Sequence, residues 1–358
     1  MPCILCVSRR CRHRHTLWLL AIVFLGLSAC SKSDEWERFS VLASQPTRLY
    51  GTQREIVLET EPVRALQALD PQLGNTPKVV LGNQLFHDKR LSGDETVSCA
   101  TCHDIQAGGD DGLVFSVGIK GQTGTINSPT VLNSGYSYRQ FWDGRAGSLT
   151  HQALAPVVNP VEMGASWSDI IAKLSSDDAL LALFEEAFGT RELEPTLLAE
   201  AIAAFERTLI TPSPFDLYLN GQKQAISEQA IAGYGLFKEY GCVACHQGVN
   251  LGGNVMQYFG AFHIIDNVDD DKIEKTGKTR QEIPIYKVPT LRNVALTSPY
   301  FHTGSVSRLS DAVKIMGAAQ LGRILSNEDV ELLVAFLESL SGKLPAHVLA
   351  TSQITSAE

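Results

Sequence analysis

Apolar residues recur with the spacing of an α-helix in five stretches of the chain. The pattern predicts helices over residues 77–87, 179–188, 197–208, 228–239 and 327–340, the last of which follows Ser326, a favourable N-cap. The apolar face of the first stretch is expected to consist of Val79, Val80, Leu81, Leu85 and Phe86. No stretch is rich in strand signals. The pattern therefore predicts an all-α fold with little or no strand.

The sequence Thr211-Pro212-Ser213-Pro214 is the clearest interruption of this pattern, because closely spaced prolines disfavour a helix. We place a domain boundary there. Two domains are then expected, over residues 62–212 and 213–345, followed by a C-terminal tail over residues 346–358. With 44% apolar and 19% charged residues, the composition is that of a soluble globular protein.

The first 29 residues have the composition of an export signal. Arg9, Arg10, Arg12 and Arg14 precede an apolar run over residues 17–27, which is too short to span a bilayer. Leu27-Ser28-Ala29-Cys30 then resembles a lipoprotein signal that is cleaved before a lipid-bearing cysteine, with ordinary secretory cleavage as the alternative. Residues 30–61 are predicted to be a polar tether. We expect a periplasmic protein anchored through Cys30, and Ser31 is compatible with sorting to the outer membrane.

Removal of the signal makes an acidic chain more acidic. The formal net charge is −9, and the loss of four arginines takes it to −13. This balance argues against nucleic acid as a partner, because nucleic acid binds to basic patches. It suits a basic or dipolar redox protein as a partner.

The eight cysteines leave no pair for a disulfide. Cys3, Cys6 and Cys11 lie in the signal and Cys30 would carry lipid, which leaves four cysteines in the mature domains. These four form two copies of Cys-x-x-Cys-His. An oxidising compartment would therefore threaten no free thiol.

The two copies are Cys99-Ala100-Thr101-Cys102-His103 and Cys242-Val243-Ala244-Cys245-His246. This is the pattern that attaches a c-type haem: both cysteines reach the vinyl groups of one porphyrin, and the adjacent histidine binds the iron. A redox Cys-x-x-Cys or half of a zinc site would explain a single copy. Two copies in an exported chain predict two covalently bound haems c.

A longer repeat follows each haem motif. Ser128-Pro129-Thr130-Val131-Leu132-Asn133 matches Val288-Pro289-Thr290-Leu291-Arg292-Asn293. We pair Phe141-Trp142-Asp143-Gly144-Arg145 with Tyr300-Phe301-His302-Thr303-Gly304, and Leu149 with Leu309. The chain is thus predicted to be a duplicated haem domain.

The repeat suggests that the two irons differ in their sixth ligand. Met316 lies seven residues after Leu309, whereas the same count from Leu149 leads to Pro156, which cannot bind iron. A thioether would close the second haem, and the first would stay open for chemistry. The alternative is that Met316 is an ordinary core residue.

Three residues after the first repeat block have side chains suited to peroxide chemistry. Glu162 could carry a proton between the two oxygens of a peroxide, and Gln152 could orient it, with His151 beside it. Surface or capping roles are the alternative for each.

The chain closely resembles the bacterial dihaem cytochrome c peroxidases, a family that also contains the tryptophan-modifying enzyme MauG. The resemblance extends from about residue 81 to residue 342 and is carried by Phe141-Trp142-Asp143-Gly144-Arg145-Ala146, Val161-Glu162-Met163, Leu291-Arg292-Asn293-Val294-Ala295 and Lys314-Ile315-Met316-Gly317. It implies two tandem cytochrome c-like domains and reduction of hydrogen peroxide to water, with electrons from a small cytochrome c or cupredoxin.

The resemblance also implies roles for individual residues. His103 would bind the iron of the peroxidatic haem, with Glu162 and Gln152 on its distal side, and His246 and Met316 would bind the iron of the electron-transfer haem. Trp142 would lie between the haems, and His302 would form a structural hydrogen bond near the second. A calcium ion would lie between the domains at Asn127, Thr297 and Pro299. Arg145 and Arg292 are candidate partners of the haem propionates. A homodimer is possible.

One position departs from the family. Many members carry a histidine that blocks the peroxidatic haem until the other haem is reduced, and the aligned residue here is Ile119, which cannot bind iron. A substitute imidazole, His151 or more weakly His87, is the alternative. We therefore expect a peroxidase that needs no reductive activation. The rival functions are a MauG-like oxidase of a protein side chain, which Met316 disfavours because MauG has tyrosine there, and a purely electron-transferring dihaem cytochrome.

Overall fold

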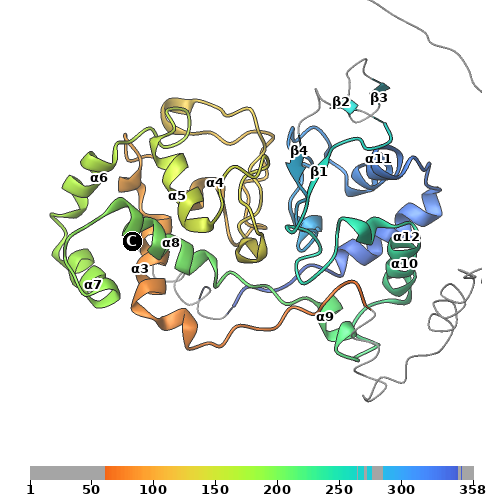
Figure 1. The fold of residues 1–358 in the computed structure, drawn as a ribbon, viewed down its shortest axis with the longest axis horizontal. Coiled ribbons are helices and arrows are strands. Elements are labelled where there is room, and N and C mark those ends of the chain that lie inside the picture. The colour runs from red at the N-terminus through yellow and green to blue at the C-terminus, as the bar shows by residue number, and fades with distance from the viewer. Residues whose placement is uncertain (1–60, 264, 270–271, 276–284, 346–347, 349–358) are drawn as a thin grey trace, which may run out of the picture. The chain divides into compact units, whose positions relative to one another are not determined.

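The computed structural model describes residues 61–263, 265–269, 272–275, 285–345 and 348 (Figure 1). The predicted signal, the lipid attachment site Cys30 and nearly all of the tether lie outside the described residues. Within the described part of the chain, no helix is both long enough and apolar enough to cross a bilayer.

The described chain is mostly helical, as predicted, and forms two halves with separate cores. The first half holds α3 (Pro77–His87), α4 (Cys99–Cys102), α5 (Leu149–Val158), α6 (Trp167–Leu174), α7 (Asp178–Phe188) and α8 (Pro195–Glu206) (Figure 1). The second half holds α9 (Pro214–Leu219), α10 (Glu228–Glu239), α11 (Leu309–Leu321) and α12 (Asn327–Glu338). Its two antiparallel ribbons pair β1 (Met256–Tyr258) with β4 (Ile285–Lys287) and β2 (Ile265–Asp269) with β3 (Lys272–Lys275).

The helix boundaries follow local chemistry. Pro77 and Pro195 occupy the first position of α3 and α8, where a missing N–H costs nothing. The predicted N-cap Ser326 accepts a hydrogen bond at Oγ from the Asp329 amide at 3.0 Å. The stretches predicted at 77–87 and 228–239 match α3 and α10, while α7, α8 and α12 differ from prediction by one or two residues at an end. The expected apolar face of α3 is wrong at Val80, which is 44% exposed.

A glycine at a helix crossing organises each half. A Cβ added to Gly82 of α3 would lie 1.9 Å from the Ala201 carbonyl oxygen of α8. The same atom added to Gly233 of α10 would lie 1.9 Å from the Leu332 carbonyl oxygen of α12. Backbone therefore packs on backbone at two equivalent crossings. In each half the helix that precedes the haem motif crosses the last helix in the same way, which confirms the duplication inferred from the sequence.

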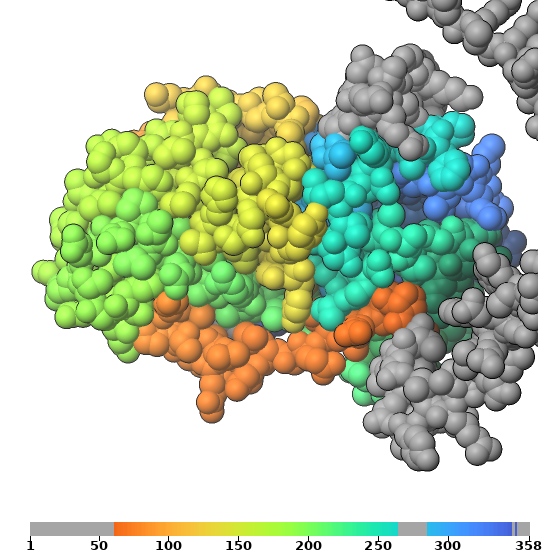
Figure 2. Space-filling model, in the orientation of Figure 1, coloured from red at the N-terminus to blue at the C-terminus, as the bar shows by residue number. Residues whose placement is uncertain are grey.

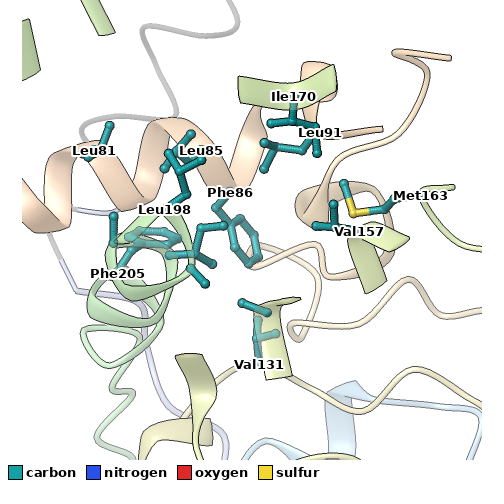
Figure 3. Close-up of a cluster of buried hydrophobic side chains, with 14 of the residues drawn as sticks. Leu81, Leu85, Phe86, Leu91, Val131, Val157, Met163, Ile170, Leu198 and Phe205 are labelled. Atoms are coloured by element: carbon teal, nitrogen blue, oxygen red, sulfur yellow. The ribbon is translucent and has the colours of Figure 1, made fainter. Parts of the chain in front are cut away.

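Large apolar side chains fill the space around the first crossing. Figure 3 shows Leu81, Leu85 and Phe86 of α3 beside Leu198 and Phe205 of α8, and all five are fully buried. The second core has Phe336 of α12 in the position of Phe205, packed against rings of α9 and α10.

The ends of the described chain are exchanged between the halves. Val63 forms a bridge with Gly248 and belongs to the second core, although it precedes the first half (Figure 2). Leu344 and Val348, which follow the second half, pack in the first core. Each core therefore contains residues from the far end of the described sequence.

The two halves contact each other through reciprocal hydrogen bonds. The Asn127 amide donates to the His302 carbonyl at 2.9 Å, and the Lys287 amide donates to the Trp142 carbonyl at 2.7 Å. Asn127 and Lys287 are 160 residues apart, and so are Trp142 and His302. The contact therefore has approximate two-fold symmetry.

This symmetry corrects one part of the expected repeat. Phe141 and Phe301 share a left-handed backbone, with φ of 65° and 67°, and the turns that contain them close through equivalent bridges. Phe141 is thus equivalent to Phe301, and Trp142 to His302. The pairing of Phe141 with Tyr300 was wrong by one residue, because both segments offer adjacent aromatic residues and only the backbone identifies the register.

The crossing glycines yield a stability prediction. Gly233→Ala should destabilise the protein by at least about 1–3 kcal/mol, because the new methyl group overlaps the Leu332 carbonyl. Gly235→Ala, on the same helix with nothing within 4 Å, should instead be stabilising by about 0.5–1 kcal/mol. Urea unfolding followed by circular dichroism measures both, and equal effects would refute the role of the crossing.

Candidate haem-binding and peroxidatic sites

The first haem motif forms a single helical turn. The Ser98 amide donates to Thr101 Oγ1 at 2.9 Å at the start of α4, and the His103 amide donates to the Cys99 carbonyl at 3.0 Å at its end. The His103 ring donates from Nδ1 to the Gly109 carbonyl at 3.3 Å, which leaves Nε2 free to bind a metal. Burial lowers the pKa of His103, so the ring is neutral as an iron ligand must be.

The second motif is arranged in the same way. Cys242–Ala244 form a 3₁₀ turn, and the His246 ring donates from Nδ1 to the Leu251 carbonyl at 3.2 Å. Burial lowers the pKa of His246 to about 4. Both histidines are therefore held in the tautomer that presents Nε2 to an iron atom.

The second motif opens onto a cavity of about 550 Å³. Its lining includes Cys242, Cys245, His246 and Met316, so the predicted thioether attachments and both predicted axial ligands share one cavity. The walls are largely aromatic and aliphatic, which suits a porphyrin. The residues fit a c-type haem.

Among the described residues that line this cavity, Lys287 is the only lysine or arginine. Its side chain is buried, and burial alone lowers its pKa to about 8. A buried ammonium group needs an anion nearby. A haem carries two propionates, so Lys287 is a better candidate for a propionate partner than either predicted arginine.

The predicted arginines are engaged elsewhere. Arg292 is fully buried and forms two 2.8 Å bonds with the Asp216 carboxylate, while its Nε donates to the Val249 carbonyl at 2.7 Å. Its assignment to a propionate is therefore not supported, because the guanidinium already has a buried carboxylate partner. Arg145 is half-exposed, bonds to Asp143 and stacks on the Phe141 ring.

Trp142, the residue predicted to lie between the haems, lies at the contact of the halves. The Trp142 and His302 rings pack edge to face with centroids 6.1 Å apart, and Tyr286 stacks on His302 at 4.4 Å. Trp142 Nε1 donates to the Asn127 carbonyl at 2.9 Å. The expected hydrogen bond of the His302 side chain is replaced by ring stacking, although its backbone carbonyl accepts from Asn127.

Glu162 lies near the first haem motif. Its Oε1 accepts a 2.7 Å bond from Asn159 Nδ2. Burial raises the pKa of Glu162, against the opposing effects of Asn159 and Arg145. The Glu162 charge in turn contributes to the raised pKa of Cys102, which places the carboxyl close to the haem attachment site. Gln152 is half-buried on α5, ahead of the turn that carries Glu162.

Ile119 supports the backbone beneath Glu162. Its amide donates to the Glu162 carbonyl at 2.9 Å, and its side chain is buried in the first core against Gly164. His151 is exposed, and the His87 ring bonds to the Asn83 carbonyl at 2.9 Å. The segment that would carry a blocking histidine is thus built into the core.

Sequence reasoning missed Asn159 and Lys287. Asn159 stands three residues before Glu162, in a turn rather than a helix, so no periodicity connected them. Lys287 occupies the position equivalent to Asn127, and the longer repeat could have drawn attention to it.

Two haem-attachment turns, each in its own cytochrome c-like domain, define a dihaem c-type cytochrome. Family models match both halves: di-haem cytochrome c peroxidase over residues 76–224 and cytochrome c over residues 230–341. The chain belongs to the di-haem cytochrome c peroxidase family.

Relatives support this assignment. Cytochrome c peroxidase Ccp of Escherichia coli K12 is 46% identical over 89% of this chain and 70% of its own length. Cytochrome c551 peroxidase of Nitrosomonas europaea is 42% identical over 81% of this chain and 87% of its own. Methylamine utilization protein MauG of Methylophilus methylotrophus is more distant, at 31% over 74% and 82%. A solved MauG-like protein associated with microbial copper homeostasis superposes with a TM-score of 0.66 at 26% identity, over 80% of this chain and 95% of that one.

Met316 can be tested as an axial ligand. Met316→His should keep the second iron six-coordinate and lower its reduction potential, because imidazole stabilises ferric iron more than thioether does. Spectroelectrochemistry follows the change, and Met163→His, in the first core, provides a methionine control outside the second cavity. Parent-like spectra and potential in Met316→His would mean that Met316 is only a core residue.

Proposed function

We propose that this protein reduces hydrogen peroxide to two water molecules, with two electrons from a small redox protein and two protons from solvent. The observation that carries the proposal is the unequal pair of sites: His246 and Met316 share the second cavity, while Pro156 stands at the position equivalent to Met316 in the first half. The bound haems supply iron centres for electron storage and for peroxide binding. The residues of the chain bind the haems, orient the peroxide and move its proton.

Glu162 carries the proton. Its raised pKa and its bond to Asn159 keep a protonatable carboxyl in a fixed position. With the haem bound, the Glu162 carboxylate would take a proton from one peroxide oxygen and deliver it to the other, which would leave as water. The Gln152 amide orients the peroxide. Asn159 acts through Glu162 and is a positioning residue.

Electrons enter at the second haem and pass the aromatic contact of the two halves. Trp142 lines the second cavity and belongs by sequence to the first half. Its ring is fixed by the hydrogen bond to Asn127 and by the edge contact with His302. This contact holds the two haem sites in fixed positions relative to each other.

Replacing Glu162 tests the proton transfer. Glu162→Gln keeps the size and the contact with Asn159 but removes the transferable proton, so turnover of peroxide should fall by about 10²- to 10⁴-fold. Covalent attachment of both haems should be unaffected. Glu186→Gln, an exposed change in the same half, is the control. Near-normal turnover of Glu162→Gln would reject the assignment.

Reductive activation is not needed in this proposal. Ile119 is an alkyl side chain within the first core, and His151 is exposed. Neither supplies a ligand that must be displaced before peroxide binds.

Electron paramagnetic resonance tests this point. The fully oxidised protein should show a high-spin ferric signal from the first haem beside a low-spin signal from the second, and it should turn over peroxide without prior reduction. Ile119→His should restore a second low-spin signal if that side chain can reach the iron. Two low-spin haems in the parent protein, with activity only after reduction, would contradict the proposal.

A MauG-like oxidase and a purely electron-transferring cytochrome are the rival functions. Three peroxidase relatives are 42–46% identical, whereas the MauG proteins are 31–33% identical and other peroxidases 28–31%. The acid Glu162 disfavours the electron-transfer cytochrome. A peroxide turnover assay with a reduced cytochrome c or cupredoxin separates these functions.

The proposal includes a calcium ion between the halves. Asn127, Thr297 and Pro299 line one cavity wall, which supports the set expected from the family. Asp110 lies in the same contact, because Gly108 packs against both the Asp110 carboxylate and the Leu296 carbonyl. Both Asp110 carboxylate oxygens are buried without a hydrogen-bond partner among the described residues. A dication would compensate that charge, and Asp110→Asn should then weaken calcium binding in a calorimetric titration.

The proposed location is the periplasm, with lipid on Cys30. The motif at Leu27-Ser28-Ala29-Cys30 supports it. Membrane fractionation of Cys30→Ala tests the anchor, and gel filtration of the same variant tests the proposed homodimer.

A further inference from the structure

Glu206 is a buried acid that the peroxide chemistry does not use. It is the last residue of α8, is 5% exposed, and its Oε2 has no hydrogen-bond partner among the described residues. Glu200 of the same helix pairs with Lys78 at 2.6 Å. An unpaired buried carboxyl is costly, so its position calls for an explanation.

The duplication places Glu206 beside the first haem. At the two helix crossings, Gly82 faces Phe205 as Gly233 faces Phe336. The next residues, Glu206 and Leu337, are therefore equivalent. Leu337 lines the second cavity together with Cys242 and His246. Glu206 thus occupies a haem-facing position that is apolar in the other half.

A second observation agrees with this placement. The pKa of Cys99 is raised to about 12, mainly by burial and next by the negative charge of Glu206. Cys99 is equivalent to Cys242 in the repeat. Glu206 also lines a cavity of about 200 Å³ with Asn133, Tyr136 and Arg207, which is large enough for water. The carboxyl therefore borders a small cavity and lies within electrostatic range of the haem attachment site.

We propose that Glu206 binds a proton when the first haem is reduced and releases it when that haem is oxidised. The electron comes from the redox donor and the proton comes from water in the small cavity. Iron gains an electron while the carboxylate becomes a carboxylic acid, so the buried site gains no net charge. Leu337, at the equivalent position in the second half, cannot ionise and supplies no such coupling.

The electrostatics agree with the geometry. Burial raises the pKa of Glu206 to about 8, and the nearby Arg207 opposes the rise. Reduced iron repels a carboxylate and raises this pKa further, whereas oxidised iron lowers it. The reduction potential of the first haem should therefore fall as pH rises. Other titratable or charged groups lie on the elements packed around Glu206. Arg207 follows it directly, and Tyr136 lies beside the small cavity. The rest are Cys99 on α4, which becomes a thioether, Lys78 and His87 on α3, and the exposed His151 on α5.

Redox titration of the dihaem protein on both sides of pH 8 tests the inference. In the parent protein the equilibrium constant for reducing the first haem should fall by up to tenfold for each pH unit of increase. This corresponds to a fall in reduction potential of about 59 mV. Glu206→Gln should remove this slope, and Glu206→Asp should retain it. Glu194→Gln, an exposed change at the start of α8, should keep the parent slope.

A second measurement detects the proton on Glu206 directly. The reduced-minus-oxidised infrared spectrum should contain the C=O band of a protonated carboxyl, which should be absent in Glu206→Gln. A parent slope unchanged in Glu206→Gln, or the absence of any such band from the parent, would overturn the proposal. Both measurements need only the attached haem, so they stay separate from the success or failure of the peroxidase assignment.

Discussion

The hydroxyl of Thr211 is the point on which both halves of the protein converge. It accepts hydrogen bonds from Asn133 Nδ2 and Asn293 Nδ2, each at 2.8 Å, and it is fully buried. These asparagines close the two repeat loops in matching left-handed conformations, which asparagine tolerates better than most residues. One side chain in the segment that joins the halves therefore holds both repeat loops.

The two halves share a packing frame but have unequal sites, because they differ at positions that do not form this packing. Pro156 replaces Met316, Glu206 replaces Leu337, and Asn127 replaces Lys287. None of these positions forms the helix crossing or the Thr211 junction. Divergence in chemistry was therefore possible without loss of the packing that both halves share.

The local features of the fold could be predicted from sequence, and the long-range ones could not. Proline at N1 of α3 and serine at the caps of α10 and α12 announce those helices in their own sequence. The haem motifs are equally local. Arg292 meets Asp216 across 76 residues, and nothing in either neighbourhood identifies the partner. The boundary predicted at Thr211 contains a buried junction that depends on two asparagines far away in sequence.

The exchange of chain ends has a consequence for the order in which the protein can fold. A chain is synthesised from its N-terminus, yet the first core is completed by Leu344 and Val348, far along the sequence. The first core therefore remains incomplete until these residues have been made. The half that is made first is the half whose core closes last.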